Sequence, residues 1–237
     1  MNQKREELVE KAIAFTKGRM EESAGHDWMH IARVLANAEA LAREEGADLL
    51  SCQLAAVMHD LINLPKNHPD RRQASRMSAR EAAAWLEGRL DAERIEWIEE
   101  AIRCHSYSAG LIPEGLVAKV VSDADNLDAL GAIGIARTFE CGGAMGTATM
   151  AAEDPFCRKR TPTDHLYTVD HFYAKLLRLK ERFYTESGRR AAERRLAFME
   201  AFLVELEEET RRESESGPLS ARPQGISAPP IPDVDRH

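Results

Sequence analysis

The residues of this chain best suited to chemistry are a histidine and an aspartate that stand side by side, His59 and Asp60. They lie in an apolar run, residues 54–62, which predicts a buried helix. Burying an ionised carboxylate is costly unless an opposite charge meets it, and a divalent metal would do so. The alternative is a core histidine that hydrogen-bonds to a neighbouring aspartate, and for this pair alone both interpretations stay open.

Further side chains of the ligand type lie on two other predicted helices. One helix carries His30, and the other carries an acidic cluster that includes Asp123, Asp125 and Asp128. Two histidines and two carboxylates form a complete nitrogen and oxygen ligand set for a transition metal, with positions left for water. The three clusters together therefore favour a metal site. On chemistry alone, Asp123 and Asp125 compete for the fourth ligand position.

The composition restricts the partners that such a site can serve. The 237 residues are 43% hydrophobic and 30% charged, which is typical of a globular protein. A formal net charge of −8 argues against a nucleic-acid polymer as partner, because such proteins need a basic face. No stretch has the length of a membrane helix, the first residues lack a signal-peptide core, and the cysteines form no CxxC pair. We expect a cytoplasmic protein, a monomer or homodimer, that binds a small molecule and no membrane.

Helical periodicity extends over most of the chain and predicts an all-α fold, with Asp27, Asp48, Ser75 and Asp91 as N-caps. The central helix should run from Asp48 to about residue 62. Residues 64–72 and 141–163 predict loops, and a helix that starts at residue 114 should bend or break near Ala132. Further helices should start at residues 164 and 187, the last with a solvated row of arginines that includes Arg195. Residues 1–212 should form one domain, followed by a disordered tail at 213–237.

These ligand-type residues occur in an order that resembles a known family. His30-x-x-Arg33-Val34, His59-Asp60 and Ala124-Asp125-x-Leu127-Asp128 resemble the H…HD…D signature of the HD-domain metal-dependent phosphohydrolases, most closely the small bacterial single-domain members. The likeness covers roughly residues 20–210 and includes the segment His171-Phe172-x-x-Lys175-Leu176.

The resemblance implies an HD-type helical bundle and a set of metal ligands. The ligands carried over are His30, His59, Asp60 and Asp125, the last because the family places its ligand directly before x-Leu-Asp. The implied cofactor is a divalent transition metal, namely Mn, Ni, Co, Fe or Zn, with Mg also possible.

Other residues are candidates for phosphate chemistry around this metal. Lys66 would neutralise charge that develops on the phosphate, and His105 would position or protonate the leaving oxygen. For the arginines that follow Lys66, a solvated charge run is the alternative, and we expect at most one of them in the site. Arg33 has a structural alternative, a pair with Asp128. The candidates for substrate binding are Arg33, Asn67, His68, Arg71 and Arg76.

The resemblance implies hydrolysis of a phosphate ester or anhydride in a small phosphorylated metabolite, and we expect a nucleotide. Some similar small bacterial hydrolases are nucleoside triphosphate pyrophosphohydrolases, and a metal beside a lysine and arginines suits a substrate with several phosphates. We therefore predict cleavage between the α- and β-phosphates. The alternatives are a nucleoside monophosphate phosphatase and a non-catalytic HD module that senses a nucleotide. Retention of all four ligand residues favours an enzyme.

Overall fold

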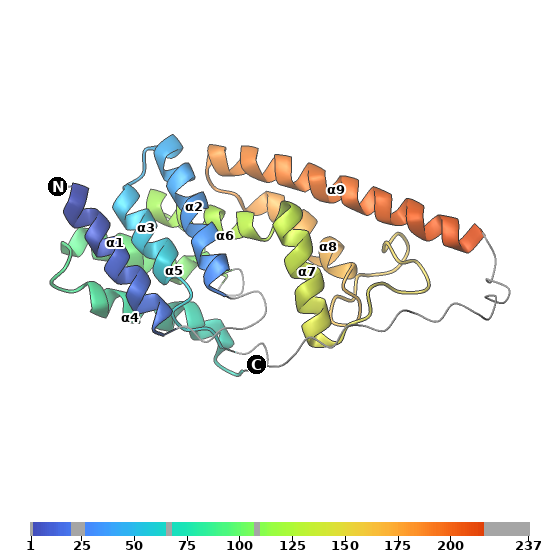
Figure 1. Cartoon of the computed structure of the whole chain (residues 1–237), viewed down its shortest axis with the longest axis horizontal. Coiled ribbons are helices and arrows are strands. Elements are labelled where there is room, and N and C mark those ends of the chain that lie inside the picture. The colour runs from blue at the N-terminus through green and yellow to red at the C-terminus, as the bar shows by residue number, and fades with distance from the viewer. Residues whose placement is uncertain (1, 20–26, 65–67, 107–109, 216–237) are drawn as a thin grey trace, which may run out of the picture. The chain divides into compact units, whose positions relative to one another are not determined.

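The computed structural model describes residues 2–19, 27–64, 68–106 and 110–215, and helices dominate these ranges (Figure 1). Within them no strand forms apart from one isolated parallel bridge between Ala148 and Tyr167, so the all-α prediction is confirmed. No helix of this part is both long and apolar enough to cross a bilayer. The elements are α1 (Asn2–Lys17), α2 (Trp28–Glu45), α3 (Leu49–Met58), η1 (Arg71–Gln73), α4 (Ala74–Leu86), α5 (Ala92–His105), α6 (Leu116–Asp128), α7 (Gly131–Met145), α8 (Asp170–Ala174), η3 (Leu176–Arg182) and α9 (Glu186–Glu215).

Two compact units divide the chain, residues 1–201 and residues 202–237. The second unit contains the last turns of α9, in which the Thr210 hydroxyl donates to the Leu206 carbonyl at 2.7 Å. The predicted tail begins inside this helix, which continues through Glu215. The rest of that tail lies outside the described residues.

Helix α3 is the centre of the first unit, because it packs against α1, α2, α5 and α6. Its residues from Leu54 to Met58 are completely buried, as expected for a helix that is apolar on every side. Helix α2 presents one apolar stripe to this core, which includes Ile31, Val34 and Ala38. Helices α4 and α5 also pack against each other. The bundle therefore fixes the directions of α2, α3, α5 and α6, which carry the predicted ligands and His105.

The predicted helix starts are confirmed where a local cap explains them. The side chains of Asp27, Asp48 and Asp91 each accept the backbone N–H three residues later. Ser75 is not a cap, because α4 begins at residue 74 and the buried Ser75 hydroxyl donates to the Arg103 carbonyl at 3.2 Å. The Ser75 hydroxyl thus bonds to α5 and is not used to cap α4.

Three boundaries predicted for the middle of the chain are wrong. Helix α3 ends at Met58, so His59 and Asp60 follow its last turn instead of lying in its middle. Helix α7 continues to Met145, into the segment predicted as a loop. No helix starts at residue 164, because Ala148 exchanges backbone hydrogen bonds with Leu166 and Thr168 and keeps that segment extended until α8 begins.

The solvated face predicted for the arginines of α9 is wrong for Arg195. Its guanidinium is half-buried and donates to the Leu127 carbonyl at 2.5 Å and to the Asn37 side chain at 3.0 Å. Asn37 in turn donates to the Ala124 carbonyl at 3.1 Å. Arg195 therefore links α9 to α2 and to the last turn of α6, where the acidic cluster lies.

The bend predicted near Ala132 is a complete break between α6 and α7. Gly131 has φ 72°, which favours glycine, and so lets the chain turn at this point. Gly134 lies against the preceding turn so closely that a Cβ placed there would be 2.2 Å from the Ala129 carbonyl oxygen. Two glycines thus allow α7 to start directly beside the end of α6.

We predict that Gly134→Ala lowers the free energy of unfolding by about 2–3 kcal/mol, because the new methyl meets backbone that cannot move aside. Gly143→Ala is the matched control, since it lies in the same helix with nothing within 4 Å of its Cβ position. That control should be neutral or stabilising by up to about 1 kcal/mol, because alanine is the better helix former. Urea denaturation measures both variants, and equal stabilities would contradict the crowding at Gly134.

Candidate metal centre

His59 follows the last turn of α3 and is fully buried. Its Nδ1 lies 2.8 Å from the Ala56 carbonyl oxygen, an acceptor, so Nδ1 carries a proton and the Nε2 lone pair is available when the ring is neutral. Burial lowers the pKa of His59 to about 4, although the neighbouring Asp60 carboxylate acts in the opposite direction. The ring is therefore neutral at neutral pH, which is the form that binds a metal.

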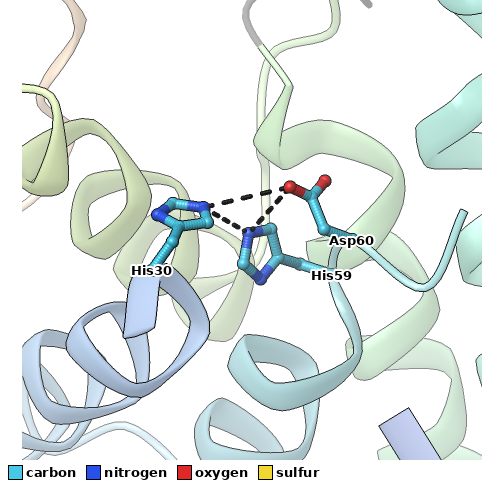
Figure 2. Close-up of side chains that lie close together, drawn as sticks. All are labelled: His30, His59 and Asp60. Atoms are coloured by element: carbon cyan, nitrogen blue, oxygen red, sulfur yellow. Dashed lines mark hydrogen bonds and ion pairs between the residues drawn. The ribbon is translucent and has the colours of Figure 1, made fainter. Parts of the chain in front are cut away.

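His30 approaches the same point from the first turn of α2, where its side chain is 2% exposed. Figure 2 shows the rings of His30 and His59 and the carboxylate of Asp60 converging from two different segments. The two Nε2 atoms are 3.3 Å apart, and His30 Nε2 lies 3.9 Å from Asp60 Oδ2. The potential ligand atoms of these three residues all lie within 4.8 Å of one another.

Asp125 adds a fourth donor to this cluster from α6. Its Oδ1 lies 3.5 Å from His30 Nε2 and 3.9 Å from His59 Nε2. Ligand atoms about 2.1 Å from one ion are separated by about 3.0–3.4 Å at bond angles of 90–109°. The distances from the two Nε2 atoms to each other and to the two carboxylates, 3.3–3.9 Å, are close to this range, so movements of the side chains would bring all four donors around one cation.

The donor set itself fits a metal ion. When both imidazoles are neutral, their Nε2 lone pairs face two carboxylate oxygens with no hydrogen between them. A divalent cation satisfies these four acceptors at once and offsets the two carboxylate charges. The structure therefore brings together the four residues predicted as ligands, His30, His59, Asp60 and Asp125.

A buried carboxylate, Asp128, fixes the orientation of His30. Its Oδ2 is 2.7 Å from His30 Nδ1, while Arg33 Nε donates to Oδ1 at 2.6 Å and Arg137 donates to Oδ2 at 2.7 Å. Burial alone would raise the pKa of Asp128, but the hydrogen bonds from His30 and Arg33 hold it well below its usual range. Asp128 is thus an anion that positions the predicted ligand His30, and Arg33 forms the structural pair that was the alternative to substrate binding.

The two competing acids of α6 are separated by the structure. Asp123 is fully buried, and its carboxylate accepts the backbone N–H groups of Tyr184 and Thr185 and the Thr185 hydroxyl, at 2.7–3.2 Å. Burial raises its pKa, although these hydrogen bonds oppose the shift. Asp123 therefore anchors the segment before α9, and Asp125 is the acid that reaches the histidines.

His105 lies at the end of α5 beside the cluster. Its Nε2 is 3.5 Å from Asp60 Oδ1, its Nδ1 is 2.7 Å from the Ile102 carbonyl oxygen, and its ring packs edge-on against His59. Burial opposes its charged form, but contact with the Asp60 carboxylate outweighs this and raises the pKa of His105. His105 is therefore placed to orient Asp60 or to supply a proton nearby.

The cluster opens into a cavity of about 810 Å³, which is within the size range of pockets for small-molecule ligands. His30, Asp60, His105 and Asp125 line one part of it. A second part comes from α7, the segment at residues 163–168, α8 and η3. The site is thus a metal-type donor set within a cavity large enough for a metabolite.

The candidates for phosphate chemistry separate into three groups. Arg71 lines the cavity, with its guanidinium donating to the Leu64 carbonyl. Arg76 is exposed, and His68 accepts the Asp70 N–H, and neither is among the cavity-lining residues. Arg33 is likewise absent from the lining. Lys66 and Asn67 lie outside the described residues.

The structure also brings His171 and Lys175 to the cavity. The sequence analysis assigned no role to these two residues. Their motif is visible in the sequence, but no local signal connects it with ligands that are more than forty residues away. Only the packing of α8 beside the cavity reveals their position.

Comparison with known proteins agrees with the family resemblance seen in the sequence. The HD domain family model matches residues 28–130, which contain all four donor residues. YpgQ of Bacillus subtilis is 36% identical over 196 residues, 80% of this chain and 86% of that protein. A crystal structure of YpgQ in complex with ADP matches with a TM-score of 0.67 and 29% identity, covering 87% of this chain and 96% of the other. An HD-superfamily hydrolase from Bacillus thuringiensis matches with a TM-score of 0.68 and 33% identity, covering 87% and 98%.

The different surroundings of Asp123 and Asp125 give a paired prediction. Asp125→Asn should lose most of the bound metal but keep its stability, because the side chain is 24% exposed and an amide is a weaker ligand than a carboxylate. Asp123→Asn should keep the metal and lose about 2 kcal/mol of stability, since an amide cannot accept all the donors that face it. Elemental analysis after loading with Mn²⁺, together with urea denaturation, measures both effects. Equal metal loss in the two variants would contradict this assignment.

Proposed function

This chain belongs to the HD domain family, and from that premise we propose that it is a metal-dependent phosphohydrolase acting on a nucleotide with more than one phosphate. The observation that carries the proposal is the convergence of four donors, His30, His59, Asp60 and Asp125, at the edge of one cavity. Two nitrogens and two carboxylates form the kind of set that holds a divalent transition metal with positions left open. The identity of that metal stays within Mn, Ni, Co, Fe, Zn and Mg.

When bound, such an ion supplies Lewis acidity, which polarises a phosphoryl oxygen and brings the pKa of a bound water towards neutrality. The residues of the chain supply orientation. Asp128 and the Ala56 carbonyl hold the two imidazoles by their Nδ1 atoms, so that both Nε2 atoms point to one place. His105 holds the second oxygen of Asp60 and is our candidate for protonating the leaving oxygen.

Charge favours a substrate with several phosphates. Asp60 and Asp125 balance a divalent ion, which leaves the charge of additional phosphates to other cationic side chains. Arg71 lines the cavity, and Lys66, in the segment just before it, is our sequence-based candidate for the same task. The YpgQ structure contains ADP, which supports a nucleotide as the ligand of this related chain. We infer cleavage between the α- and β-phosphates.

Retention of the complete donor set favours an enzyme over a non-catalytic sensor. A module that only binds a nucleotide has no need for two buried imidazoles held with their Nε2 atoms 3.3 Å apart. In this chain both imidazoles are oriented by hydrogen bonds, and Asp128 is buried and charged to support one of them. Such an arrangement is costly to maintain and is explained by a bound metal.

We predict that the Mn²⁺-loaded protein converts a deoxynucleoside triphosphate into the monophosphate and pyrophosphate. The expected products follow from attack at the α-phosphate, and ion-exchange chromatography separates them from diphosphate and orthophosphate. Exhaustive chelation should abolish the activity, and Mn²⁺ should restore it. Release of orthophosphate from a nucleoside monophosphate, with triphosphates unchanged, would move the protein to the monophosphate phosphatase alternative.

His105→Ala should lower the turnover number by roughly 100-fold, the lower range for loss of a positioned acid. Its metal content should remain near that of the wild type, because Asp60 and the other three ligands stay in place. His68→Ala is the control, since His68 does not line the cavity, and its turnover should change less than about twofold. Steady-state kinetics and elemental analysis on the same preparations check both variants. An unchanged turnover in His105→Ala would show that His105 has no role in the chemistry.

A further inference from the structure

The motif His171-Phe172-x-x-Lys175-Leu176 contributes to the cavity without belonging to the metal centre. His171 and Lys175 both line the cavity. They come from α8 and the residue that follows it, far along the chain from the helices that supply the four metal donors. The proposed metal chemistry assigns no role to these two side chains. Both are basic, and both line the cavity that contains the metal centre.

The backbone directs the two side chains to the same side. The Lys175 N–H donates to the His171 carbonyl at 3.0 Å, so one helical turn separates the residues. Side chains four residues apart in such a turn share a face. Phe172 and Leu176, each next in sequence to one of them, are 0% and 3% exposed and anchor the segment in the core. The local fold thus places both residues on the cavity wall, one helical turn apart.

A buried ion pair fixes the start of this turn. Asp170 is fully buried and receives two hydrogen bonds from the Arg160 guanidinium, at 2.5 and 2.6 Å, and one from the Thr163 N–H at 2.6 Å. Such a bidentate pair restricts both position and orientation. Because α8 begins at Asp170, the pair also determines where His171 and Lys175 lie.

The ring of His171 has its own partner. Asp164, which also lines the cavity, has its Oδ2 2.9 Å from His171 Nδ1 and accepts the proton there. This contact sets the orientation of the ring. When the imidazole is protonated, its second N–H is a donor for an anion, and the Asp164 carboxylate compensates the added charge.

The distribution of charge in the cavity indicates what this basic pair binds. At the metal centre, the charges of Asp60 and Asp125 balance a divalent ion, and the Arg137 guanidinium donates to Asp128. Lys175 lies outside that arrangement, on a wall built by a different part of the chain. A nucleoside di- or triphosphate has phosphates beyond the one attacked, and these need cationic partners of their own.

We propose that Lys175, together with His171 held by Asp164, binds the phosphates of a nucleotide that lie beyond the phosphate at the metal centre. This site makes the protein select nucleotides by the number of their phosphates. The inference rests on the proposed function in taking a nucleotide as the substrate. It concerns binding, however, and therefore holds in the absence of turnover.

Titration calorimetry on the full-length, Mn²⁺-loaded chain tests this with two probes, AMP and α,β-methylene-ADP, which cannot be cleaved at its methylene bridge. The wild type should bind α,β-methylene-ADP at least about tenfold more tightly than AMP, on the scale of one charge-assisted hydrogen bond. Lys175→Met should weaken the binding of α,β-methylene-ADP by about tenfold and change that of AMP less than twofold. Unchanged AMP binding also shows that the variant is folded.

Two further variants distinguish the loss of the positive charge at residue 175 from a general effect of removing a lysine. Lys175→Arg retains the charge and should recover most of the affinity for α,β-methylene-ADP. Lys180→Met removes an exposed lysine of η3 that does not line the cavity, and it should bind both probes as the wild type does.

The inference is overturned if Lys175→Met binds α,β-methylene-ADP normally, if it loses affinity for both probes equally, or if the wild type does not distinguish them. The product assay with a deoxynucleoside triphosphate is scored separately. Cleavage with normal binding by Lys175→Met would retain the proposed function and reject this site. Selective loss of α,β-methylene-ADP binding, without cleavage by the wild type, would do the reverse.

Discussion

The buried carboxylate of Asp128 is the contact on which the rest of the site depends. It lies at the end of α6 and joins His30 and Arg33 of α2 to Arg137 of α7. An ionised carboxylate that is 1% exposed is tolerated only while these partners remain. The positions of the three helices are therefore coupled. The same contact that turns His30 Nε2 towards His59 also holds α7, which forms part of the cavity wall.

Through this coupling, one cavity has two different sides: the donors of the candidate metal centre, and a wall that begins with α7. The donors of the candidate metal centre come from α2 and α6, which pack on the apolar α3, and from the two residues that follow α3, where burial keeps His59 neutral. The other part of the cavity comes from α7 and the irregular chain after it, where buried apolar side chains such as Phe172 and Leu179 are combined with buried polar contacts. The Arg160–Asp170 pair, for example, holds α8 in place. The candidate metal centre thus lies beside a wall that carries the side chains we propose to bind the substrate.

Much of the candidate metal centre could be predicted from the sequence, because its signals are local or ordered along the chain. The caps Asp27, Asp48 and Asp91 act on backbone groups three residues away, so their effect is visible without tertiary structure. The order of His30, His59-Asp60 and Asp125 indicated a ligand set, and the fold brings those side chains to one point. The break between α6 and α7 was likewise indicated by glycines, although its position was shifted by a few residues.

What the sequence determined by itself was the helical class, most helix starts and the chemical types of the donors, since these follow from periodicity, capping and residue chemistry. Residue chemistry left the two acids of α6 open and the family resemblance favoured Asp125, whereas the tertiary structure shows how they differ, because Asp123 accepts hydrogen bonds from backbone groups of residues 184 and 185. The tertiary structure also decided that Arg195 is half-buried, and it brought His171 and Lys175 into the cavity. The physical reason is the same in each case. These side chains are positioned by hydrogen bonds and packing between segments far apart in sequence, which local patterns do not specify.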